Sequence, residues 1–186
     1  MAQGRIIYVM GPSGAGKTRL IEYARRKIDG SRAIAFGHRY ITRPLGKDSE
    51  NYVALSHAEF VQRKVRGLFA YDWQAYGFDY GIGVEIVSWL KAGLSVVIDG
   101  SRAHFVSHKL DIAPLIPVLI TARRDVLLHR LTTREREDAA AVETRLERAE
   151  KFTPADLALV TIDNSGAIEA AGESFLALLI EHASAS

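Results

Sequence analysis

Cysteine is absent from the 186-residue sequence. This absence excludes a disulfide framework, a thiolate zinc site and a cysteine nucleophile. An excess of one charge is absent too, because 24 Lys and Arg residues are balanced by 22 Asp and Glu residues, for a formal net charge of +2. So small a charge does not favour a nucleic-acid partner.

Long apolar runs are also missing. No uninterrupted apolar stretch could cross a bilayer, so we expect no membrane partner. The chain opens with a predicted strand rather than a charged leader or a cleavable apolar segment, so we expect a cytoplasmic protein. The histidines show no paired spacing, which predicts no histidine metal site. With 48% hydrophobic residues, the chain can form one domain over residues 1–186.

One stretch, residues 11–18, matches the phosphate-binding pattern G-x-x-x-x-G-K-[ST]. It reads Gly11, Pro12, Ser13, Gly14, Ala15, Gly16, Lys17 and Thr18. An apolar predicted strand, Arg5–Met10, precedes it, and a predicted helix follows to Ile28. Glycines let backbone N–H groups converge on an anion, Lys17 can reach the β- and γ-phosphates, and the Thr18 hydroxyl suits Mg²⁺. The loop therefore predicts binding of a nucleoside triphosphate.

Strands and helices alternate along the chain, which predicts an α/β fold with a parallel central sheet and helices on both faces. Further strands are predicted at residues 33–36, 52–55, 95–99, 116–120 and 159–162, and further helices at 56–65, 84–91, 126–131, 142–151 and 168–180. Residues 69–80 predict a hairpin that turns at Tyr76-Gly77. Ser56 and Glu59 have the spacing of a capping box.

Asp99 ends an apolar predicted strand, where a phosphate-loop enzyme needs an acid to hold the magnesium shell. A turn or helix-cap aspartate is the alternative. Asp163 and Asn164, after the last predicted strand, could likewise approach a nucleotide base or simply form a turn.

Arginines lie between two predicted helices, at Arg134, Arg136, Arg145 and Arg148. Mobile arginines near a phosphate loop can close over a triphosphate and stabilise charge on the transferred group. The acids interleaved with them leave a second interpretation open, a solvated helix pair joined by salt bridges.

Two further basic clusters are predicted to bind an anionic acceptor. They consist of His38, Arg39 and Arg43, and of Arg102 and His104. Arginine suits this task because its planar group binds phosphate through two hydrogen bonds. The tyrosines of the middle third are expected mainly to fill a small β-rich region, with Tyr52 and Tyr80 predicted to contact the acceptor.

These motifs together resemble the guanylate kinase family. Ile41-Thr42-Arg43-Pro44 is similar to that family's Thr-Thr-Arg-x-Pro-Arg segment, and Tyr52 with Ser56 is similar to its Tyr-x-Phe-Val-Ser run. The resemblance implies a phosphate-loop NTPase fold. It also implies a core formed by residues 1–36 and 82–186, a small β-rich acceptor-binding insert at about 37–81 and a helical lid at about 132–148.

Three positions depart from the guanylate kinase pattern. Leu45 replaces an acceptor-binding arginine, and Tyr71 and Ser101 replace the acids that read guanine in that family. A site without those acceptors loses discrimination for a guanine edge, so GMP is not the expected acceptor.

A narrower resemblance covers residues 38–44, 50–56, 80–86 and 100–104, which are similar to the ribose 1,5-bisphosphate phosphokinases of phosphonate catabolism. Those enzymes use ATP to phosphorylate ribose 1,5-bisphosphate to 5-phosphoribosyl 1-diphosphate. The resemblance implies ATP and Mg²⁺ as co-substrate and cofactor, and a phosphorylated sugar as partner. Lys17, Asp99 and the arginines at 134, 136 and 145 would then screen the charge of two polyanions.

Three alternatives stay open from the sequence alone. They are a nucleoside monophosphate kinase with altered base choice, a non-catalytic guanylate-kinase-like binding module, and a generic ATPase. The intact Lys17, Thr18 and Asp99 argue against the binding module, and the basic clusters argue against the ATPase. The sequence leaves the oligomeric state open, a homodimer included.

Overall fold

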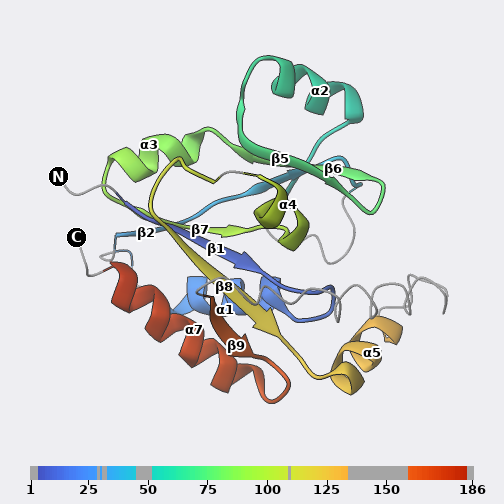
Figure 1. The fold of residues 1–186 in the computed structure, drawn as a ribbon, viewed down its shortest axis with the longest axis vertical. Coiled ribbons are helices and arrows are strands. Elements are labelled where there is room, and N and C mark those ends of the chain that lie inside the picture. Colours follow the sequence, from blue (N-terminus) through green and yellow to red (C-terminus); the bar gives the residue numbers. More distant parts are fainter. Residues whose placement is uncertain are drawn as a thin grey trace.

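The computed structural model describes residues 4–28, 30, 33–44, 52–108, 110–133 and 159–183. Its central sheet has five strands, in the order β2-β7-β1-β8-β9, and every neighbouring pair is parallel (Figure 1). The strands are β1 (Ile6–Met10), β2 (Ile34–Phe36), β7 (Ser95–Asp99), β8 (Leu115–Thr121) and β9 (Val160–Asp163). The expected α/β fold with a parallel sheet is confirmed.

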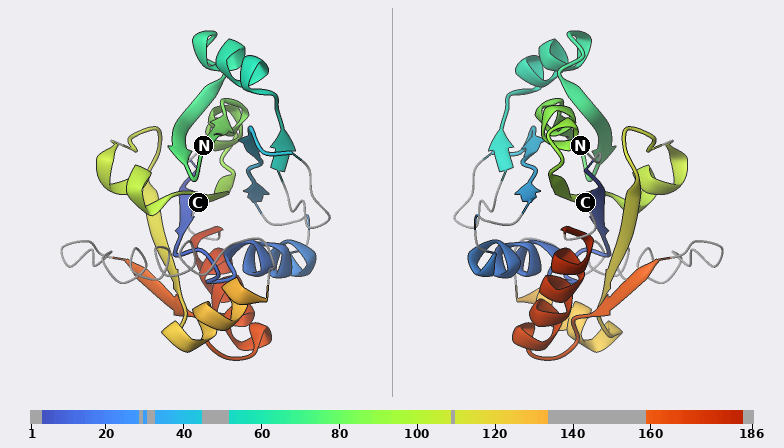
Figure 2. Two further views of the ribbon diagram at one scale, coloured as in Figure 1. Left: turned by 90° about the vertical axis from the view of Figure 1, so that its right-hand side faces the viewer. Right: turned by 90° about the vertical axis from the view of Figure 1, so that its left-hand side faces the viewer.

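Strand β1 lies at the centre of the sheet, and all five of its residues are buried. Because side chains alternate along a strand, β1 contributes to two separate cores. Ile7 and Val9 belong to one core, together with buried residues of the helices α1 (Lys17–Lys27) and α7 (Ile168–Ala183). Ile6, Tyr8 and Met10 belong to the other, which includes residues of α3 (Glu85–Lys91) and α4 (Arg102–Ser107). Helices therefore cover both faces, as expected (Figures 1 and 2).

The helices of the described chain have the following bounds. They are α1 (Lys17–Lys27), α2 (His57–Val65), α3 (Glu85–Lys91), α4 (Arg102–Ser107), α5 (Arg124–Thr132) and α7 (Ile168–Ala183). None of these helices is both long and apolar enough to cross a membrane.

A second sheet of four strands lies beside the central one, in the order β4-β3-β6-β5 (Figure 1). Its strands are β3 (Arg39–Ile41), β4 (Tyr52–Ala54), β5 (Phe69–Ala75) and β6 (Phe78–Gly83). The predicted β5–β6 hairpin is confirmed, and its turn holds Tyr76 and Gly77 at positive φ angles of 53° and 76°. The capping box of α2 is also confirmed, because Glu59 N donates to Ser56 Oγ at 3.2 Å and Ser56 N donates to Glu59 Oε2 at 2.8 Å.

The sequence analysis missed one helix, and several of its predictions fall on residues that the structure does not describe. Helix α4 was not predicted, because six residues are too few to establish a helical period. The helix predicted at 142–151 and most of the lid predicted at about 132–148 lie outside the described residues, as do Arg134, Arg136, Arg145 and Arg148.

Candidate active site

The phosphate-binding loop connects β1 to α1, and helix α1 begins at Lys17 as the motif requires. The ammonium group of Lys17 donates to the carbonyl oxygens of Gly11 at 3.1 Å and Pro12 at 3.4 Å. Gly16 precedes the helix with a φ of 87°, a left-handed conformation that disfavours any residue with a side chain. The loop is therefore formed as an anion site whose lysine lies against it.

A buried amide supports this loop from the far end of the chain. Asn164 is only 2% exposed, and its Nδ2 donates to the Ala15 carbonyl oxygen at 2.7 Å. A Cβ atom at Gly16 would lie 2.4 Å from that nitrogen, so the contact itself requires glycine. Arg130 of α5 adds a longer bond of 3.4 Å to the Gly14 carbonyl oxygen.

The sequence did not predict either supporting contact. For Asp163 the turn interpretation holds, because its Oδ1 accepts a hydrogen bond from Ser165 N at 3.0 Å. Asn164 instead joins the end of β9 to the phosphate-binding loop. The only signal in the sequence for this role of Asn164 was its position directly after a predicted strand, next to Asp163.

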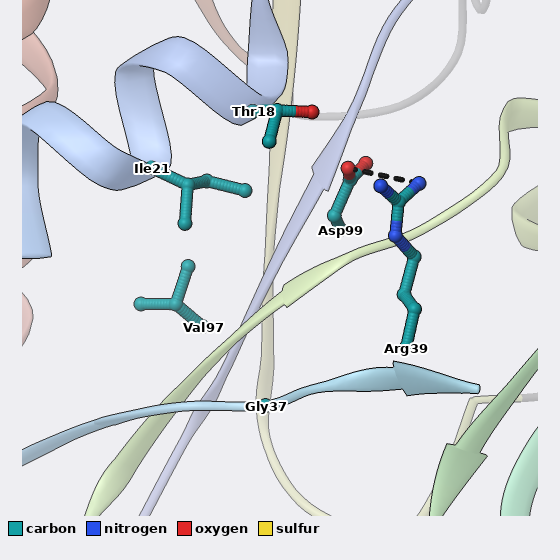
Figure 3. Close-up of a pocket in the computed structure, with 6 residues that line it drawn as sticks. All are labelled: Thr18, Ile21, Gly37, Arg39, Val97 and Asp99. Atoms are coloured by element: carbon teal, nitrogen blue, oxygen red, sulfur yellow. Dashed lines mark ion pairs between the residues drawn. The ribbon is translucent and has the colours of Figure 1, made fainter. Parts of the chain in front are cut away.

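A pocket next to the loop brings Thr18 and Asp99 together with Arg39 (Figure 3). Ile21, Gly37 and Val97 complete its lining. Asp99 Oδ2 lies 3.0 Å from Arg39 Nη1, whereas the buried Asp99 Oδ1 has no hydrogen-bond partner in the described part of the chain. Arg39 is thus paired with the acid that the sequence assigned to the metal.

The donor atoms of this pocket fit Mg²⁺. A carboxylate oxygen without a partner and a hydroxyl group are the hard oxygen ligands that this ion prefers. The described residues contain no group of three or more His, Cys, Asp or Glu side chains that could hold a metal by themselves. Mg²⁺ at Thr18 and Asp99 would therefore take its other ligands from water and from nucleotide phosphates.

Tyr8 fixes the turn that follows Asp99. Its hydroxyl accepts a hydrogen bond from Ser101 N at 3.0 Å and lies 3.1 Å from both the Ser101 carbonyl oxygen and His104 Nδ1. Burial raises the pKa of Tyr8 above its usual range, so the group stays a neutral phenol. A Cβ atom at Gly100 would lie 2.1 Å from the Tyr8 ring, so only glycine fits there.

The predicted acceptor residues occupy different environments. Arg43 lies over the Tyr52 ring at 4.9 Å, and Tyr52 donates its hydroxyl hydrogen to the Pro44 carbonyl oxygen at 3.0 Å. Tyr80 stacks on Trp73 with ring centroids 5.6 Å apart. His38 is exposed between β2 and β3.

Arg102 and His104 lie on α4, where both are affected by burial. Burial lowers the pKa of Arg102. His104 is only 3% exposed and contacts the rings of Tyr71, Trp73 and His108. Burial, with a smaller contribution from His108, lowers the pKa of His104 to about 4, so its ring is neutral near pH 7. This environment supports a packing role for His104 rather than the predicted contact with an anionic acceptor.

Tyr71 and Ser101, the two positions where the sequence analysis expected base-reading acids to be missing, have structural roles. Tyr71 is buried in the core beneath α3 and α4, and burial raises its pKa to about 12. Ser101 precedes α4, and its hydroxyl accepts from His104 N at 3.4 Å. Neither position supplies a carboxylate to a base.

Comparison with solved structures identifies the fold of the chain. A guanylate kinase from Anaplasma phagocytophilum matches with a TM-score of 0.70 at 16% identity, covering 100% of this chain and 89% of that one. A sugar kinase from Janibacter sp. HTCC2649 matches with a TM-score of 0.52 at 18% identity, over 98% and 99% of the two chains. The chain therefore has the guanylate-kinase-like phosphate-loop fold.

Comparison with known sequences identifies the family. No protein-family model matches the chain. It is 45% identical to ribose 1,5-bisphosphate phosphokinase PhnN from Desulfomicrobium baculatum over 177 residues, 95% of each chain. It is 47% identical to the protein of that name from Burkholderia mallei over 180 residues, 96% of this chain and 97% of the other. The chain belongs to the ribose 1,5-bisphosphate phosphokinase PhnN family and is a kinase.

Proposed function

We propose that this kinase transfers the γ-phosphoryl group of ATP to the 1-phosphate of ribose 1,5-bisphosphate, giving 5-phosphoribosyl 1-diphosphate and ADP. A bond forms between the γ-phosphorus and an oxygen of the 1-phosphate, and the bond to the bridging oxygen of ADP breaks. The protein acts in the cytoplasm on this small phosphorylated sugar, as one domain with the acceptor-binding insert and the lid that the sequence predicts.

The observation that carries this proposal is the ion pair at the end of β7. Arg39 belongs to the second sheet, yet its guanidinium group lies 3.0 Å from Asp99, in a pocket also lined by Thr18 of the phosphate-binding loop. A cation of the proposed acceptor-binding insert therefore lies beside the phosphate-binding loop, where the nucleotide would bind. In-line transfer between two polyanions requires such proximity.

The proposed mechanism depends on positioning and charge rather than on a strong base. The attacking phosphate oxygen is already anionic near neutral pH, so no group needs to remove a proton from it. Lys17 and the loop N–H groups bind the β- and γ-phosphates, and Arg39, Arg43 and Arg102 bind the acceptor. Mg²⁺ held by Thr18 and Asp99 would screen charge on the nucleotide.

The remaining arginines are assigned to the lid. We propose that Arg134, Arg136 and Arg145 close over the triphosphate and stabilise charge on the transferred group, as the sequence predicts.

A coupled assay of ADP release tests the proposal. Mg·ATP is supplied with ribose 1,5-bisphosphate, GMP, AMP, UMP or ribose 5-phosphate, and the product is identified by ³¹P NMR. We expect turnover with ribose 1,5-bisphosphate alone, and its loss in a Lys17→Met control. Turnover with a nucleotide instead would overturn the acceptor assignment and leave the protein a kinase.

A further inference from the structure

The Arg39–Asp99 ion pair joins two groups that have different tasks in the proposed reaction. Arg39 is assigned to the acceptor and Asp99 to the magnesium shell, but in the structure each is the other's partner at 3.0 Å. The two side chains are only 18% and 9% exposed. The pair is the contact drawn with a dashed line in Figure 3.

A pair this enclosed cannot be broken without a replacement for each member. Removing one partner of a buried ion pair leaves an uncompensated charge, which is strongly unfavourable. Asp99 forms no second ion pair among the described residues, and its Oδ1 has no hydrogen-bond partner there. Magnesium at Oδ1 and Arg39 at Oδ2 would be two cations that share one negative charge, so each would weaken the hold of the carboxylate on the other.

We infer that Arg39 is an exchangeable counter-ion. It neutralises Asp99 until magnesium nucleotide binds, and it is then released to a phosphate group of the acceptor. This inference rests on the proposed function, because the reaction supplies the second partner of Arg39. It adds that the two substrates bind cooperatively through one side chain.

The cooperativity follows from the charges. Magnesium nucleotide alone would draw on the charge of Asp99 and leave the guanidinium group of Arg39 incompletely compensated. The acceptor alone attracts Arg39 and leaves Asp99 unpaired. When both bind, both charges are compensated, so each substrate strengthens the binding of the other by the same factor. Coupling of this kind is typically about 5- to 150-fold.

Isothermal titration calorimetry with a non-hydrolysable ATP analogue tests this inference without turnover. The analogue is titrated with Mg²⁺ or with EDTA, and with or without ribose 1,5-bisphosphate. We expect the wild-type protein to bind the magnesium analogue at least about fivefold more tightly when the acceptor is present. We expect no such coupling in EDTA.

Four variants separate the roles of the two residues. Arg39→Met removes the competitor, so it should bind the magnesium analogue more tightly than wild type without acceptor, bind the acceptor more weakly, and show no coupling. Arg39→Lys retains a charge and should keep part of the coupling. Asp99→Asn should lose the magnesium effect and bind acceptor more tightly in the absence of nucleotide. Arg66→Met, at an exposed site on the same insert, should behave as wild type.

The outcomes distinguish the exchange from the proposed function. Unchanged or weaker binding of the magnesium analogue by Arg39→Met, in a variant with the wild-type melting temperature, would overturn the exchange. Equal coupling in Arg39→Met and wild type would overturn it as well. If ribose 1,5-bisphosphate does not bind the wild-type protein but Arg39→Met still tightens magnesium-dependent binding, the acceptor assignment fails and the exchange at Asp99 is supported.

Discussion

Replacing Asn164 should weaken nucleotide binding, although this residue lies outside the phosphate-binding motif. The Asn164→Ala variant loses the 2.7 Å bond to the Ala15 carbonyl oxygen, in a place where both residues are buried. An unpaired buried polar group costs about 1–3 kcal/mol. Asn164 Oδ1 is itself buried and has no hydrogen-bond partner among the described residues, so its removal recovers part of that cost. We therefore expect the free energy of unfolding to fall by about 1–2 kcal/mol.

The same bond orders the loop before nucleotide binds. Since about 1.4 kcal/mol corresponds to a tenfold change in affinity, we expect Asn164→Ala to bind ATP about three- to tenfold more weakly. Asn164→Asp should be worse, because it places a carboxylate next to the Ala15 carbonyl oxygen and near the bound phosphates. Thr161→Ala, at an exposed site on β9, should change stability by no more than about 0.5 kcal/mol.

Urea unfolding and calorimetric titration with the non-hydrolysable ATP analogue measure the two effects separately. A fall in stability with unchanged affinity would show that the loop does not depend on Asn164 for its binding conformation. Equal behaviour of Asn164→Ala and Thr161→Ala in both assays would refute the argument entirely.

Three further predictions concern the turn after Asp99. Gly100→Ala forces a Cβ atom to within 2.1 Å of the Tyr8 ring, so urea unfolding should show a loss of about 1–3 kcal/mol, and no loss would contradict the contact. Tyr8→Phe removes the hydroxyl that binds Ser101, so it should lower the free energy of unfolding by about 1–2 kcal/mol. It should also reduce kcat more than it raises the KM for ATP. Unchanged stability would show that the Tyr8 hydroxyl does not support the turn after Asp99. His104 has its pKa lowered from 6.5 to about 4, so the unfolded state binds its proton first as pH falls, and stability should drop by up to about 3 kcal/mol between pH 6.5 and pH 4. This drop should be smaller in His104→Phe, and an identical pH dependence in both proteins would contradict a neutral buried ring.

Local sequence patterns predicted the parts of the molecule that depend on neighbouring residues. The phosphate-binding loop, the hairpin at Tyr76-Gly77 and the capping box at Ser56 each involve groups within a few positions of one another. Their physical requirements, a positive φ angle or a hydroxyl three residues before an acid, are visible in residue types. The alternation of apolar segments likewise sufficed for the parallel sheet.

Contacts between distant segments could not be predicted in this way. Asn164 lies 149 positions from Ala15, and Tyr8 lies 93 positions from Ser101. Nothing near either residue in the sequence distinguishes a loop support from an ordinary core or turn residue. The parallel registers of β7, β1, β8 and β9 bring these segments to the same edge of the sheet.

Tyr71 and Ser101, where the sequence analysis expected base-reading acids to be missing, have structural roles in this fold. Tyr71 fills a core between the second sheet and α4, and Ser101 caps α4 and binds Tyr8, the residue that holds the turn after Asp99. Restoring an acid at Tyr71 would bury a carboxylate among aromatic rings, which costs several kcal/mol unless the group stays protonated. We therefore expect that a substitution at Tyr71 would not by itself supply an ionised base-reading acid. On the proposed function, we expect acceptor choice to depend on which charges the pocket can compensate.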